Sequence, residues 1–188
     1  DPEKYQSVEG VGHTSFLSGQ FYAELYCMCM EEEATYATTW NIHEKGDRYH
    51  NDFGYLDGPM ENPRPRSNYW HMQMLAQNFS GEYCDGTSNQ AWVKVFGSRD
   101  DDKISVIIIN MYDDRNFNFE LRLDQKKIEE FIPLRLNVDV SLPVSYEDII
   151  MDQTTLLLGF DKTGKLVKRI EYGIDQAMNW QPPVVKTF

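Results

Sequence analysis

The chain has 188 residues, of which 41% are hydrophobic and 13% aromatic, and its net charge is −12. This length and composition predict a globular protein with a sizeable core, built as one large domain or two small ones, and they exclude an intrinsically disordered chain. The acidic balance without a basic run predicts no nucleic-acid partner and no binding to a membrane, and no apolar run has bilayer-spanning length. Because the chain begins Asp1-Pro2-Glu3, we expect a processed product or a piece of a longer protein.

The cysteines and histidines give no indication of a metal site. Cys27 and Cys29 lie two residues apart on a predicted helix, where they point in different directions and do not easily bridge each other. Together with Cys84 they form no four-ligand zinc pattern, so we interpret all three as buried free thiols. His43 and His50 lie close in the sequence to Glu44 and Asp52, but the spacing of these four residues fits no standard site. The sequence therefore predicts no metal and no other cofactor.

The first half of the chain predicts a helix, a strand, a long loop and a second helix. Apolar residues recur at helical spacing over residues 16–30, after a capping residue at Thr14 or Ser15. Residues 35–42 are rich in Thr, Tyr, Trp and Ile and predict a β-strand. Residues 44–65 predict a loop whose length and aromatic content favour a functional role. A second helix is expected to begin at Ser67 or Asn68 and to end before Gly81.

From Gln90 onward the pattern predicts short antiparallel strands with a helical turn at 126–131 and a hairpin turn at 161–164. The predicted strands are residues 91–96, 103–110, 116–123, 134–140, 146–150, 154–160 and 166–172. The predicted fold is thus an α/β piece over residues 1–88 followed by an all-β antiparallel sandwich over residues 89–188. One strand with two helices cannot form a sheet. The strand at 35–42 must therefore join the β domain or pair with a segment outside this chain.

Three stretches resemble one family of enzymes: YATTWNIHE, PRPRSNYWHMQMLAQNFSGEY and LLLGFDKTGKLVKRIEY. The chain is similar to the C-terminal end of retaining glycoside hydrolases with a (β/α)8 barrel and an appended β-sandwich, the clan that includes arabinofuranosidases, β-xylosidases and agarase-like enzymes. The resemblance implies that residues 14–30, 35–42 and 67–80 are the last helix–strand–helix of a TIM-type barrel, most of which is absent. Both catalytic carboxylates would precede Asp1, and neither Glu9 nor Glu44 matches them. The chain alone would carry no catalytic residue and be inactive.

The resemblance also implies a sugar-binding role for the end of the strand at 35–42. Trp40 corresponds to an indole that stacks on the apolar face of a sugar, and Arg48 offers a pairing site for an acidic or sulfated sugar. A core role for Trp40, and solvated loop charges at 43–48, remain open alternatives. The predicted substrate-binding residues are Trp40, Asn41, His43, Glu44, Arg48 and Tyr55.

Two functions from different classes follow. The first is the C-terminal portion of a glycoside hydrolase acting on a plant or algal polysaccharide, with the missing N-terminal barrel segment as its partner, in the same protein or a second chain. It predicts an exposed apolar face where that barrel would pack. The second is a non-catalytic carbohydrate-binding or interaction module, and an unrelated α+β structural protein is a third. The expected ligand is a polysaccharide or oligosaccharide. The resemblance implies an extracellular or periplasmic location, which three unpaired cysteines argue against.

Overall fold

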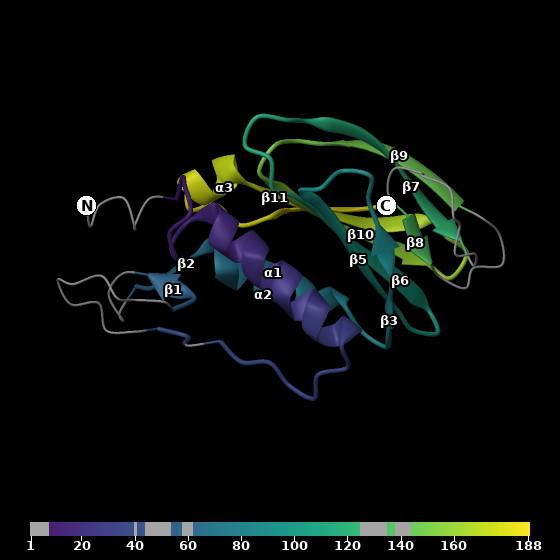
Figure 1. Cartoon of the computed structure of the whole chain (residues 1–188), viewed down its shortest axis with the longest axis horizontal. Helices are drawn as coiled ribbons and strands as arrows, with labels where there is room; N and C mark the ends of the chain where they lie inside the picture. The colour runs from purple at the N-terminus through teal and green to yellow at the C-terminus, as the bar shows by residue number, and fades with distance from the viewer. Residues whose placement is uncertain (1–7, 40, 44–53, 58–61, 125–134, 138–143) are drawn as a thin grey trace. The chain divides into compact units, whose positions relative to one another are not determined.

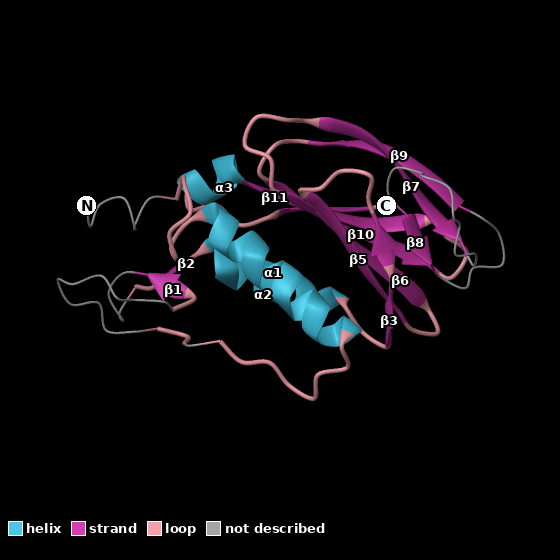
Figure 2. Cartoon of the chain, viewed as in Figure 1, coloured by secondary structure: helices cyan, strands magenta, loops and turns pink. Residues whose placement is uncertain are grey.

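The computed structural model describes residues 8–39, 41–43, 54–57, 62–124, 135–137 and 144–188. Strands make up most of the described secondary structure (Figure 2). In chain order (Figure 1), the elements are α1 (Phe16–Glu31), β1 (Leu56–Asp57), β2 (Arg64–Pro65), α2 (Ser67–Asn78), β3 (Glu82–Cys84), β4 (Gly86–Thr87), β5 (Val93–Arg99), β6 (Lys103–Asn110), β7 (Phe117–Asp124), β8 (Arg135–Asn137), β9 (Val144–Ile150), β10 (Thr154–Asp161), β11 (Leu166–Gly173), α3 (Ile174–Met178) and β12 (Val184–Thr187). The chain forms two compact units, residues 1–75 with 172–183 and residues 76–171 with 184–188. The predicted division at residue 88 stays a prediction.

The second unit consists mainly of two β-sheets. One sheet has six strands in the order β12-β11-β10-β6-β5-β3, and the other has four in the order β4-β8-β7-β9. At the centre of the six-stranded sheet, β6 pairs antiparallel with both β5 and β10. In the smaller sheet β7 pairs antiparallel with β9 and parallel with β8. A hairpin turn joins β10 to β11, where Gly164 N–H donates to the Asp161 carbonyl at 2.9 Å, as the DKTG sequence predicted.

One hydrophobic core lies between the inner faces of these two sheets. Val106 and Ile108 of β6, Leu158 of β10 and Leu121 of β7 are all completely buried in it. Along β6 and β10 the core residues occur at every second position, which is the spacing of side chains on one face of a strand. The two sheets therefore pack face to face in a sandwich-like arrangement.

A charged cluster joins the two sheets at one side. Arg169 of β11 donates from Nε to Asp148 of β9 at 2.8 Å and also pairs with Glu171 on its own strand. Tyr146 donates its hydroxyl to the same Asp148 carboxylate at 2.9 Å. Burial alone would raise the pKa of Asp148, but hydrogen bonds from the Ile149 N–H, Arg169 and Tyr146 lower it below its usual value. The carboxylate stays charged and holds the guanidinium between the sheets.

In the first unit α1 packs closely against the beginning of α2. Gly19 makes this approach possible, because a methyl group at that position would overlap with Ser67 Oγ and His71 Nδ1. The rings of Phe16, His71 and Tyr172 pack together with centroids 5.3–5.4 Å apart. This aromatic cluster is completely or almost completely buried and fixes the first turns of both helices.

The predicted barrel piece is wrong. The two helices form at 16–31 and 67–78, but residues 35–39 and 41–43 adopt no strand between them. Residues 35–38 are exposed, so their β-prone Thr and Tyr side chains have no sheet face to cover. The propensity of such residues is realised only when a neighbouring strand supplies backbone partners and a packing surface. The described part of the chain is instead mostly β with antiparallel sheets and three short helices.

Helix α1 ends with a complete Schellman motif. The N–H groups of Glu33 and Ala34 donate to the carbonyls of Met30 at 3.2 Å and Cys29 at 2.8 Å. This geometry places Glu33 at φ 52°, a left-handed conformation for which glycine is preferred.

We therefore expect Glu33→Gly to stabilise the protein by about 1 kcal/mol, because glycine adopts this conformation without a Cβ penalty. Urea unfolding followed by circular dichroism measures the change. Glu33→Ala removes the same charge but keeps the Cβ, so it should give no comparable gain. An equal gain from alanine would show that charge, not backbone strain, limits the stability of this helix end.

Candidate functional site

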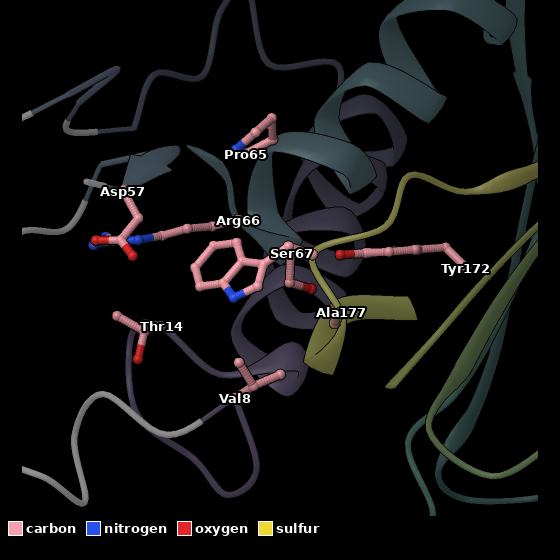
Figure 3. A pocket seen from close by; sticks show the side chains of 9 residues that line it. Val8, Thr14, Asp57, Pro65, Arg66, Ser67, Tyr172 and Ala177 are labelled. Atoms are coloured by element: carbon pink, nitrogen blue, oxygen red, sulfur yellow. The ribbon is translucent and has the colours of Figure 1, made fainter. Parts of the chain in front are cut away.

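A small cavity lies in the first unit at the beginning of α2. Its volume is about 90 Å³, enough for several water molecules. Figure 3 shows Asp57 and Arg66 pointing toward each other on one side of this cavity and Tyr172 directing its hydroxyl toward Ser67 and Ala177 on the other. The lining residues come from three separate parts of the chain and are Val8, Thr14, Asp57, Pro65, Arg66, Ser67, Tyr172, Ala177 and Trp180.

Two arginines hold Asp57, the one carboxylate among the described residues that line this cavity. The short hairpin of β1 and β2 sets Asp57 directly opposite Arg64, whose Nη2 donates to Asp57 Oδ2 at 3.1 Å. Arg66 Nη2 donates to the other carboxylate oxygen at 3.1 Å. The Arg66 side chain is 6% exposed and its Nη1 also donates to the Gly54 carbonyl at 3.1 Å, whereas the Arg64 side chain is 50% exposed. Arg66 is therefore a fixed internal support of the carboxylate, and Arg64 is its half-exposed second partner.

The first turn of α2 is anchored by buried hydrogen bonds. Ser67 donates its hydroxyl to the Phe16 carbonyl at 2.9 Å, and His71 Nδ1 lies 2.8 Å from the Ser67 carbonyl, to which it donates as the Nδ1–H tautomer. Burial lowers the pKa of His71 to about 4, although its hydrogen bond to the Ser67 backbone opposes the shift. The imidazole is thus neutral near pH 7. Burial raises the pKa of the Tyr172 phenol, which is neutral as well.

Trp180 stands at the end of α3 in a strained backbone conformation. The N–H groups of Trp180 and Gln181 donate to the carbonyls of Ala177 at 3.1 Å and Gln176 at 2.8 Å, which is again a Schellman motif. Trp180 therefore has φ 54°, at a position where a bulky side chain is unfavourable. Its ring lines the cavity, and the Arg64 guanidinium carbon lies 4.2 Å from the ring centroid. A strained aromatic residue beside a cavity is a recognised indication of function.

The arrangement provides binding chemistry. It combines an indole with hydroxyls from Thr14 and Ser67. Beside them, two arginines pair with one carboxylate, which leaves a local charge of +1 in a chain whose net charge is −12. Asp57 is the only carboxylate among the described residues that line the cavity. Within the same described residues, no three His, Cys, Asp or Glu side chains gather closely enough to hold a metal ion.

Of the six residues predicted to bind sugar, the structure describes Asn41, His43 and Tyr55. Asn41 and Tyr55 come together, because the Tyr55 N–H donates to the Asn41 carbonyl at 3.0 Å. The Tyr55 hydroxyl joins those of Tyr26 and Thr39 in a cluster, and burial raises its pKa. Neither these two residues nor His43 lines the cavity. Trp40, Glu44 and Arg48 lie outside the described residues, so their roles stay predictions.

Sequence reasoning missed most of the residues that line the cavity. Two arginines separated by one proline, Arg64 and Arg66, are conspicuous in an acidic chain and mark the beginning of α2. Trp180 is followed by Gln181-Pro182-Pro183, and this local pattern does not distinguish a packing role from a ligand contact. Asp57 carried no local signal, because its importance depends on a hairpin that brings it opposite Arg64.

None of the helices that the structure describes has both the length and the apolar character needed to cross a membrane. No family model, no curated protein and no solved structure matches this chain.

Proposed function

We propose that this chain is a carbohydrate-binding module serving a polysaccharide-degrading protein outside the cytoplasm, and that the cavity at the beginning of α2 binds the end of an oligosaccharide. The single observation that carries the proposal is Trp180. A tryptophan kept in a left-handed conformation costs about 1 kcal/mol relative to glycine. That cost is understandable if the ring itself is needed for a ligand.

The chemistry of the cavity suits a sugar. The CH groups on one face of a pyranose or furanose pack on an indole face. Arg64 covers one face of the Trp180 ring, and the sugar would stack on the opposite face. The Asp57 carboxylate and the Thr14 and Ser67 hydroxyls supply acceptors and donors for sugar hydroxyls, which would take the places of water in the cavity.

A hydrolytic function for this chain alone has less support. Glycoside hydrolysis requires two carboxyl groups on either side of the scissile bond, and the cavity is lined by Asp57 as its only described carboxylate. That carboxylate is already engaged by two arginines, which disfavours the protonated form that a general acid needs. Binding without catalysis is therefore the function that we propose for these residues.

Isothermal titration calorimetry with xylohexaose, arabinohexaose and agarohexaose tests the proposal. We expect one of these three plant or algal oligosaccharides to bind the full chain and Trp180→Gly to weaken that binding at least tenfold. Circular dichroism should show a folded variant, since glycine relieves the backbone strain at this position. Trp92→Gly is the matched control, because Trp92 is also exposed but lies in the second unit, residues 76–171 with 184–188, which we call the sheet unit.

Two results would contradict the proposal. If none of the three oligosaccharides binds at millimolar concentration, the cavity has no such role. If Trp92→Gly weakens binding while Trp180→Gly does not, the sugar site belongs to the sheet unit and not to this cavity.

A further inference from the structure

Helix α1 carries a second apolar stripe besides the one that packs inside the first unit. Its buried side chains, Phe16, Gln20, Ala23 and Cys27, follow the spacing of one helix face. Leu17, Phe21 and Met28 form another line about 110° further around the helix, at 100° per residue, and Glu24 is the one charged residue on this line. Phe21 is 55% exposed and Met28 is 49% exposed. A helix with apolar residues on both of these sides is typical of a helix that is covered by two neighbours.

The charges around this outer stripe are all of one sign. The helix ends in Glu31, Glu32 and Glu33, which are exposed, and residues 5–44 contain no lysine or arginine. Three carboxylates at a helix C-terminus are unfavourable, because the helix dipole already places partial negative charge there. Among the described residues, none forms an ion pair with these three carboxylates. Within the described part of the chain this acidic end has no paired cation, and a basic partner would complement its charge.

We propose that the outer stripe of α1, defined by Leu17, Phe21 and Met28, docks a helix of a partner that carries apolar residues at helical spacing and Lys or Arg beside the acidic end of α1. Helix α1 has 16 residues, so it is about 24 Å long and offers a docking surface for one helix of similar length. A second copy of this chain is disfavoured, since each copy has a net charge of −12 and no cation along this helix.

Fluorescence anisotropy with labelled model peptides tests this docking on the full chain. The probe is an 18-residue amphipathic helix of Leu and Lys, and its charge-reversed counterpart of Leu and Glu is the control peptide. We expect the Leu/Lys helix to bind at least tenfold more tightly than the Leu/Glu helix. Phe21→Ser with Met28→Ser should weaken its binding at least tenfold. Glu31→Gln with Glu32→Gln and Glu33→Gln should weaken it and flatten its salt dependence.

The matched control changes two exposed apolar residues elsewhere. Ile149→Ser with Met151→Ser alters side chains that are 50% and 45% exposed in the sheet unit, and should leave peptide binding unchanged. Equal loss in this control, or equal binding of both peptides, would overturn the proposal by showing nonspecific attraction. A dimer in light scattering that Phe21→Ser with Met28→Ser abolishes would also overturn it, because the occupant would then be a second copy.

Discussion

Replacing Ile150 by alanine should destabilise the sheet unit by about 2–5 kcal/mol, whereas replacing the adjacent Ile149 should cost well under 1 kcal/mol. Ile150 is completely buried in the core between the two sheets, and Ile149 is 50% exposed on the same strand. The two variants remove identical atoms from consecutive positions. The difference between them therefore reports which face of β9 meets the core.

Guanidinium unfolding followed by circular dichroism measures both variants. The pairing of β9 with β7 sets Ile150 opposite Phe117 and Ile149 opposite Asn118. A shift of the strand by one residue would exchange the two faces. A larger effect from Ile149→Ala than from Ile150→Ala would therefore show that this register, and the core built on it, is wrong.

Acidification from pH 6.5 to pH 4 should reduce the stability of the first unit by about 3 kcal/mol through His71 alone. Burial lowers the pKa of this imidazole from 6.5 to about 4, so the unfolded chain takes up a proton before the folded chain does. The stabilising contribution is complete above pH 6.5, where both states are neutral. It is lost as the pH falls toward the folded pKa, because protonation then favours the unfolded state.

Protonation of His71 also affects the cavity, because the neutral ring donates to the Ser67 carbonyl at the beginning of α2. Urea unfolding at pH 7, 6, 5 and 4.5, followed by near-ultraviolet circular dichroism, gives the slope of the unfolding free energy against pH. His71→Gln, which cannot titrate, should flatten the slope in this window and lower the stability at pH 7. Asp100, Asp161 and Glu120 have pKa values lowered by hydrogen bonds, so their contributions are lost from about pH 5 downward, and the slope between pH 7 and pH 5 reports His71. An unchanged slope in His71→Gln would contradict the assignment.

Local sequence patterns were sufficient for most individual elements. The apolar spacing at 16–30 and the cap-and-glycine signals at 67–81 predicted α1 and α2 closely. The strand at 103–110 agrees with β6 at both ends, and the DKTG turn joins β10 to β11 as expected. These features depend on side-chain periodicity and on turn residues that act over a few positions. The prediction of a strand at 35–42 was wrong because strand formation needs a partner strand, which no local pattern can supply.

The residues that line the cavity could be identified only from the tertiary structure. Its residues come from chain positions 8–14, 57–67 and 172–180. The hydrogen bond from Ser67 to the Phe16 carbonyl and the packing of Phe16 on Tyr172 connect these parts of the chain only after folding. The sequence by itself determined an acidic, globular chain with two helices and a set of strands, and it suggested a sugar-binding role through resemblance. Only the tertiary structure decided that the described strands of the second unit form mainly two facing sheets, and that Trp180 lines the cavity. Long-range pairing fixes both outcomes, and it leaves no signal at the spacing of neighbouring residues.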